Sequence, residues 1–203
     1  MRLYHTPTSP FVRKVMVVAH ETGLVDRIET VFLRPVPTQP DPALSKDNPL
    51  SKIPVLITDD GPLFDSPVIC EYLDTLHTGR KLVAPSGWER FRTLRAQALC
   101  DGILDAAIVV FYEKQNRPKD LHWQPWLDGH TQKVRQGLDA LDEEAARFDD
   151  SAVDLGQICA GVTIGWLEFR NAVADIRAGR SRLFAWYERF RQRPSMRATE
   201  PHA

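Results

Sequence analysis

The sequence predicts an α/β domain followed by an all-α domain, because three stretches of the chain have different patterns. Up to residue 78, short β-branched runs alternate with apolar residues at helical spacing. Residues 79–87 contain the glycines, the proline and the charges that are typical of a linker. After this linker only helical spacing continues. We therefore expect an α/β domain over residues 1–78, a linker over 79–87 and a helical domain over 88–203.

The α/β domain is predicted to run strand, helix, strand, loop, strand, strand, helix. We expect the strands at residues 2–5, 28–33, 55–58 and 63–64, and the helices at 9–22 and 68–77. Four prolines between residues 35 and 42 exclude a regular helix from the loop, which has room for one short turn. In the first helix, Arg13, Lys14 and Glu21 form a polar face opposite the apolar one.

The second domain is predicted to contain only helices, at residues 88–117, 124–147 and 183–193, with another that opens at Asp154. Asp154 and Gln157 have the spacing of a capping box. Gly161 and Gly165 place two small residues on one helical face, which permits close packing of a neighbour. Pro194 is expected to end the last helix.

Composition excludes several classes of partner. The chain has 203 residues and a formal net charge of −1, so it lacks the positive charge that nucleic-acid binding requires. Its aliphatic runs are far shorter than the roughly 18 residues of a membrane span. The six histidines have no metal-ligand spacing, so we expect no metal.

The cysteines and the start of the chain indicate a cytoplasmic protein. Cys70, Cys100 and Cys159 form no CxxC motif, and each lies within an apolar helical pattern. We expect them to be buried, reduced thiols, as is usual in the cytoplasm. The first residues contain no apolar signal core.

Two serine-proline pairs point to a small anion-binding site. Ser9 and Ser66 each stand before a proline and a run with helical spacing, so each is predicted to cap a helix N-terminus, with Pro67 as the first residue of the second helix. Between them, Pro54 lies at the start of a strand, where its missing N–H is tolerated. Helix N-termini favour negative charge, which makes this part of the chain the candidate site.

These segments resemble the signature segments of a known family. Residues 8–14 read Thr-Ser-Pro-Phe-Val-Arg-Lys, residues 48–56 read Asn-Pro-Leu-Ser-Lys-Ile-Pro-Val-Leu, and residues 65–67 read Asp-Ser-Pro. In this order and separation they resemble cytosolic glutathione S-transferases, especially bacterial members with the same start, and the resemblance extends through the helical half. It implies a thioredoxin-like N-terminal domain, an all-α helical-bundle C-terminal domain, glutathione as co-substrate and a homodimer.

The resemblance also implies roles for individual residues. Ser9 would be the catalytic residue, donating its hydroxyl proton to the glutathione thiolate, with Thr8 as the substitute if Ser9 points away. Ile53 would pair with the cysteinyl part of glutathione through its backbone, next to a cis peptide bond to Pro54. The full set that the resemblance assigns to glutathione is Ser9, Phe11, Arg34, Lys52, Ile53, Pro54, Asp65 and Ser66.

The same residues have simpler interpretations. The serines and Asp65 are often no more than helix caps and turns, and Arg34 and Lys52 are equally well explained as solvated surface charges. Ser51 stands where relatives often have glycine, so a positive φ there implies some strain. No cysteine lies near Ser9, which disfavours disulfide exchange as the main reaction.

The electrophile pocket is expected where the helical domain faces this site. Asp101 and Asp105 share one face of the long helix, and Tyr112 follows two turns later. With Trp166 they are candidates to line the pocket; alternatively, the two aspartates are a polar stripe at a domain contact. We expect a glutathione transferase that acts on a small electrophile. Two alternatives are a non-catalytic glutathione-binding or protein-interaction module and a glutathione-dependent isomerase or peroxidase.

Overall fold

The computed structural model describes residues 1–202 and confirms an α/β half followed by a helical half. Its one sheet has the strand order β2-β1-β3-β4. β2 is parallel to β1, whereas β3 is antiparallel to both β1 and β4. The strands are β1 (Arg2–His5), β2 (Glu29–Phe32), β3 (Leu56–Thr58) and β4 (Gly61–Leu63). With its helices, this mixed sheet forms the expected thioredoxin-like domain.

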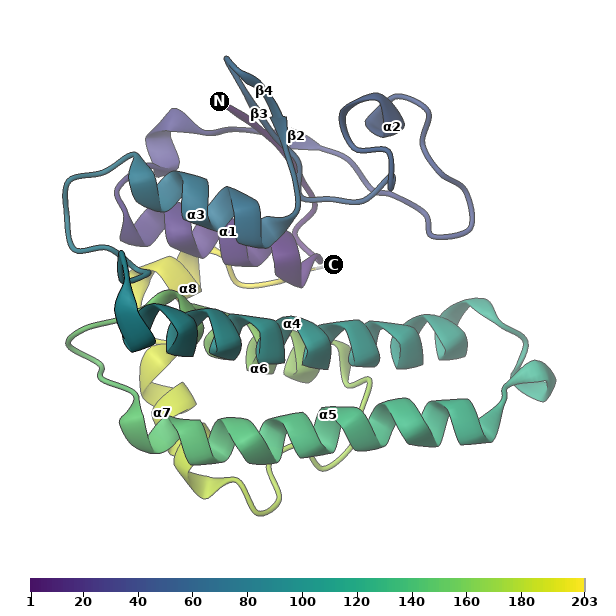
Figure 1. Ribbon diagram of the computed structural model, residues 1–203. Coiled ribbons are helices and arrows are strands. Elements are labelled where there is room, and N and C mark those ends of the chain that lie inside the picture. The colour runs from purple at the N-terminus through teal and green to yellow at the C-terminus, as the bar shows by residue number, and fades with distance from the viewer. Residues whose placement is uncertain (203) are drawn as a thin grey trace.

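Helices α1 (Pro10–Glu21) and α3 (Ser66–Thr75) form a layer between the sheet and the helical half (Figure 1). The loop after β2 contains only the short helix α2 (Leu44–Asp47), as its prolines predict. The helical face that α1 turns toward its own domain is apolar, and its valines are buried.

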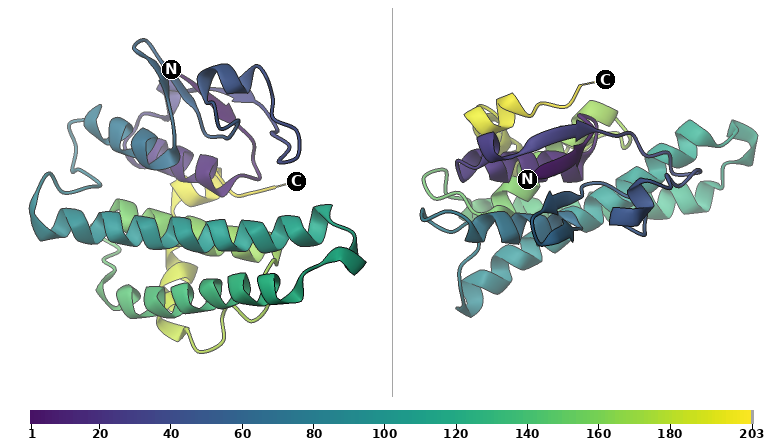
Figure 2. Two further views of the ribbon diagram at one scale, coloured as in Figure 1. Left: turned by 45° about the vertical axis from the view of Figure 1, so that its right-hand side comes forward. Right: turned by 90° about the horizontal axis from the view of Figure 1, so that it is seen from above.

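The helical half is built around α4, which packs against both α5 and α6. Figure 2 shows α4 and α5 as a long pair that extends beyond the N-terminal domain. The helices of this half are α4 (Gly87–Asn116), α5 (Gln124–Glu144), α6 (Leu155–Arg170), α7 (Ser181–Phe190) and α8 (Pro194–Ala198). The expected capping box is confirmed, since the Asp154 side chain accepts from the Gln157 N–H at 2.9 Å. Helix α8 was not expected: Pro194 opens a further short helix, a position that suits proline.

The buried apolar residues form one cluster that continues from the sheet into the helical bundle. Cys70, Cys100 and Cys159 belong to it as free, buried thiols, which confirms the expectation for these residues. Burial raises the pKa of Cys70 and of Cys100 to about 12. None of the helices in residues 1–202 is long and apolar enough to span a membrane.

The polar face of α1 is buried against the helical half instead of facing solvent. Lys14 is only 1% exposed, and its Nζ lies 2.7 and 2.9 Å from the two carboxylate oxygens of Asp101 on α4. At the other end of α1, Glu21 accepts two hydrogen bonds from Arg193, at 3.0 and 2.8 Å. Burial raises the pKa of Glu21, but hydrogen bonds from Arg193 and Ser195 more than offset this, and the net pKa is lowered. The polar face therefore holds the two halves together.

Candidate functional site

Ser9 is the N-cap of α1, as the sequence predicts. Its Oγ accepts a hydrogen bond from the Val12 N–H at 3.3 Å. Within residues 1–202, no acceptor takes the hydroxyl proton of Ser9. Ser9 is therefore able to cap the helix and at the same time donate to an anion placed at the helix N-terminus.

Thr8, the substitute for Ser9, connects this N-terminus to the helical half. Its carbonyl oxygen accepts from Nε1 of Trp166 on α6 at 3.2 Å. Its hydroxyl is 3.5 Å from that of Thr6. Trp166 itself is only 3% exposed, so its indole forms a fixed wall beside the start of α1.

The segment before β3 presents an unpaired backbone edge. The Ile53–Pro54 bond is cis, as the resemblance implies. The Asn48 side chain holds the loop by donating to the Lys52 carbonyl at 2.8 Å and accepting from the Leu50 N–H at 3.0 Å. Among the described residues, the N–H and C=O of Ile53 have no partner. A peptide laid along this edge would supply both partners, as an added strand does.

Ser51 in the same loop has a positive φ of 51°, the conformation for which strain was expected at this position. Its hydroxyl accepts from the Asp41 N–H at 2.8 Å. The serine therefore offsets some of the strain of a left-handed backbone with a hydrogen bond that glycine cannot make.

The start of α3 differs from the prediction by one residue. Asp65, not Ser66, is the N-cap, and Ser66 is already the first helical residue, with Pro67 behind it. The reason is the backbone: Asp65 is extended, whereas Ser66 has entered the helix. No side chain caps this helix, so its first free N–H groups, together with the buried Ser66, can receive a carboxylate.

The predicted charged residues near α4 fall into two groups. Asp101 is paired with Lys14, so it serves the contact between the two halves, and the Phe11 ring lies 5.6 Å from Lys14 Nζ at the same contact. Asp105, one turn further along α4, faces the N-terminal loops. Partial burial raises its pKa, while the nearby Lys52 counteracts this.

An aromatic wall continues from Trp166 along α4 and α6. The Phe111 ring meets the Trp166 ring edge-on, with 6.1 Å between their centroids, and contacts Tyr112 in the same way at 5.4 Å. Arg170 lies 4.8 Å from the Phe111 ring centroid. Tyr112 and Trp166 were predicted from the sequence, whereas Phe111 and Arg170 were not. The four-residue spacing of Trp166 and Arg170, which puts both on one face of α6, was the available signal.

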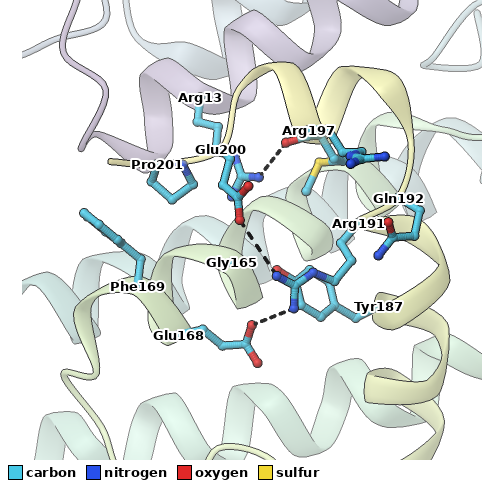
Figure 3. Close-up of a pocket in the computed structure, with 11 residues that line it drawn as sticks. Arg13, Gly165, Glu168, Phe169, Tyr187, Arg191, Gln192, Arg197, Glu200 and Pro201 are labelled. Atoms are coloured by element: carbon cyan, nitrogen blue, oxygen red, sulfur yellow. Dashed lines mark hydrogen bonds and ion pairs between the residues drawn. The ribbon is translucent and has the colours of Figure 1, made fainter. Parts of the chain in front are cut away.

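A separate pocket of about 430 Å³ lies behind α1, between α6, α7 and the C-terminal segment (Figure 3). None of the predicted site residues lines it. Arg191 lies 3.6 Å from Glu168 and 3.8 Å from Glu200, so these three charges are paired with one another. The buried Arg13 donates to the Met196 carbonyl at 3.0 Å and fastens the C-terminal segment. We assign this pocket a structural role.

Among residues 1–202, no cluster of histidine, cysteine or acidic side chains is suited to hold a metal ion. The residues at the start of α1, before β3 and at the start of α3 instead offer a hydroxyl, a backbone edge and free helix N–H groups. These are groups that bind a peptide with carboxylate and thiolate charges.

Comparisons with known proteins agree with this arrangement. Residues 8–76 match the family model of the glutathione S-transferase N-terminal domain, and residues 124–189 match that of the C-terminal domain. The uncharacterized GST-like protein YibF of Escherichia coli (strain K12) is 31% identical over 204 residues, which cover 99% of this chain and 98% of that protein.

Two crystal structures of a glutathione transferase family member from Pseudomonas fluorescens Pf-5 are similar over the whole chain. The first, with bound glutathione, has a TM-score of 0.93 and 42% identity, covering 100% of this chain and 99% of that one. The second, with bound S-(propanoic acid)-glutathione, has a TM-score of 0.89 and 40% identity, covering 100% of both chains.

Proposed function

Because the chain belongs to the glutathione S-transferase family, we propose that it binds glutathione and stabilises its thiolate for attack on a small electrophile. The observation that carries the proposal is the state of Ser9. Its hydroxyl caps α1 through its oxygen and keeps its proton free for a ligand. Ser9 is then the catalytic residue and acts as a hydrogen-bond donor, because an alcohol is far too weak an acid to act as the base.

Simple energetics support this role. A free thiol has a pKa of about 8.5, and lowering it by about two units requires about 2.7 kcal/mol. One hydrogen bond to a charged group contributes about 1.5–3 kcal/mol. A helix N-terminus adds roughly 0.3–1 kcal/mol, and up to about 2 in a partly buried site. Ser9 and the N-terminus of α1 together are sufficient.

The rest of glutathione would be held by the other predicted residues. The backbone of Ile53, with Pro54 behind it, is proposed to pair with the cysteinyl part. The γ-glutamyl carboxylate would lie at Ser66 and the uncapped N-terminus of α3, with its ammonium group near Asp65. Lys52 and Arg34 are the proposed partners of the glycyl carboxylate, and Phe11 is proposed to pack beside the thiol.

We propose that the electrophile lies beside the start of α1, against Tyr112 and Trp166 and near Asp105. This wall is aromatic and lies next to Thr8, one residue from the proposed thiolate donor. Asp101 contributes indirectly, by fixing Lys14 and therefore the distance between α1 and α4.

The protein is further proposed to act as a cytoplasmic homodimer. Its three free thiols suit a reducing compartment. Trp88 and Phe91, three residues apart on α4, are 70% and 59% exposed, and such uncovered apolar faces commonly mark interfaces. Light scattering should give twice the chain mass, and Phe91→Glu should reduce it toward the mass of one chain.

The function is tested by glutathione conjugation to an activated aryl chloride. Ser9→Ala should abolish most of the turnover while glutathione still binds, and the absorbance of the bound thiolate should move to higher pH. Ser9→Thr, which keeps a hydroxyl and a cap, is the matched control and should retain activity. Unchanged turnover in Ser9→Ala would remove Ser9 from the mechanism.

The same experiment separates the alternatives. Binding to glutathione with no turnover of any electrophile would favour a non-catalytic binding or interaction module. Turnover restricted to isomerisable substrates or to peroxides would favour an isomerase or peroxidase.

A further inference from the structure

Two arginines at the edge of the candidate site have no acidic partner. Arg170 ends α6, and Arg34 follows β2. Within residues 1–202 neither forms an ion pair, whereas Arg177 is paired with two glutamates and Arg180 with Asp139. Burial chiefly lowers the pKa of Arg170, and Tyr112 partly counteracts this.

Arg170 is directed toward the reacting end of the proposed site. It lies one helical turn after Trp166 on the same face of α6, and the Trp166 indole donates to the carbonyl of Thr8. Phe111 contacts both side chains, at 6.1 Å from the Trp166 ring centroid and 4.8 Å from the Arg170 guanidinium. Arg170 is therefore linked through Phe111 to the Trp166 wall beside the start of α1.

The guanidinium of Arg170 is held between two aromatic rings, and one of its N–H groups has no hydrogen-bond acceptor. It stacks between Phe111, at 4.8 Å, and Phe169, at 4.6 Å. Its Nε is buried and has no hydrogen-bond partner among the described residues. A buried N–H without an acceptor is costly, and the planar edge of an arginine matches the two oxygens of a carboxylate.

We propose that Arg170 binds a carboxylate carried by the electrophile. This inference rests on the proposed glutathione transferase activity and names its substrate class: small electrophiles with an acidic group. In conjugation to an aryl chloride, the thiolate sulfur forms a bond to the ring carbon, and chloride leaves with the bonding electron pair. The carboxylate is unchanged in this step, and its contact with Arg170 orients the ring.

The kinetic test compares 4-chloro-3,5-dinitrobenzoate with its neutral carboxamide at saturating glutathione. Wild type should have the lower KM for the benzoate. Arg170→Met should raise that KM about tenfold or more, the loss expected for one charge-assisted hydrogen bond, and leave KM for the carboxamide and for glutathione within about twofold. Arg170→Lys should recover part of the preference. Arg117→Gln, which removes an exposed α4 charge, is the control and should change nothing.

A binding test keeps the inference separate from the activity. Calorimetry with S-(2-carboxyethyl)glutathione and the matching carboxamide thioether requires no turnover. The acid should bind more tightly to wild type and lose its advantage in Arg170→Met. Equal affinity of acid and amide would overturn the inference. A loss of affinity for glutathione itself in Arg170→Met would also overturn the inference, because Arg170 would then bind the glycyl carboxylate of glutathione. If the acid advantage is present but no electrophile reacts, the proposed transferase function fails and the anion site stands.

Discussion

The ion pair between Lys14 and Asp101 is the contact whose loss should cost most stability. The Lys14 side chain is 2% exposed and that of Asp101 is 19% exposed. In Lys14→Met the Asp101 carboxylate is left without its partner at the contact between the two halves. Removing one partner of a buried pair costs about 3–5 kcal/mol. For a chain of this length, each kcal/mol corresponds to about 2–4 °C in Tm, so we expect a decrease of roughly 6–20 °C.

The double variant Lys14→Met with Asp101→Leu tests the reasoning. Without either charge, the desolvation cost also disappears, so the double variant should be more stable than Lys14→Met alone and close to wild type. The free energy of unfolding is measured in urea for all variants. Arg117→Gln, which breaks an exposed pair with Glu113, is the control and should cost only about 0.3–0.5 kcal/mol. The reasoning fails if Lys14→Met loses as little free energy of unfolding as the control does. It also fails if the loss in the double variant equals the sum of the losses in the two single variants.

Further predictions concern close packing, backbone strain, thiols and pH. Gly165→Ala should lower the free energy of unfolding in urea by about 1–3 kcal/mol, because the new Cβ would lie 2.4 Å from the buried guanidinium of Arg13 on α1. Gly102→Ala is the control: it has open space around it and should raise the free energy of unfolding by up to about 1 kcal/mol. Ser51→Gly should leave the free energy of unfolding nearly unchanged, since the backbone strain and one hydrogen bond are lost together. Ser51→Ala keeps the strain but loses the hydrogen bond, so it should lower the free energy of unfolding by about 1 kcal/mol. If Ser51→Gly were the less stable of the two, the role given to the Ser51 hydroxyl would be wrong. The three cysteines should react with a thiol reagent only after unfolding; fast labelling of the native protein would contradict their burial. Because the pKa of Glu21 is lowered in the folded state, its ionised carboxylate stabilises the fold at pH values above the ordinary pKa of a glutamate. This stabilisation is lost as the pH falls through the lowered pKa, so Glu21→Gln should make the free energy of unfolding depend less on acidic pH. Identical acid unfolding curves for wild type and variant would contradict this prediction.

Local signals in the sequence were enough for most elements and for two of the helix N-termini, whereas the ends of other helices differ by a few residues. Ser9 and the capping box at Asp154 were predicted because a cap depends only on residues within one turn. The cis bond before Pro54 came from the family resemblance and is confirmed, and Ser51 has the positive φ for which the sequence implied some strain. The start of α3 was placed one residue late because either Asp65 or Ser66 is a suitable cap residue.

Contacts between distant residues could not be predicted. The sequence pattern of α1 predicts that its charged face is exposed to solvent. In the structure, however, Lys14 on this face is paired with Asp101, 87 residues further along the chain. The grouping of Phe111 with Arg170 likewise depends on how α4 and α6 are brought together. Spacing within one helix does not contain that information.

The buried charges on α1 also limit how the molecule moves. Lys14 and Glu21 lie about two turns apart on the same polar face of α1 and are anchored to α4 and to the segment that leads into α8. A hinge motion of one half against the other would have to separate both pairs at once, so such a motion is opposed. Incoming molecules must then be selected by rearrangement of individual rim side chains, on the fast timescale of rotamer changes, instead of by slow closure of one domain onto the other.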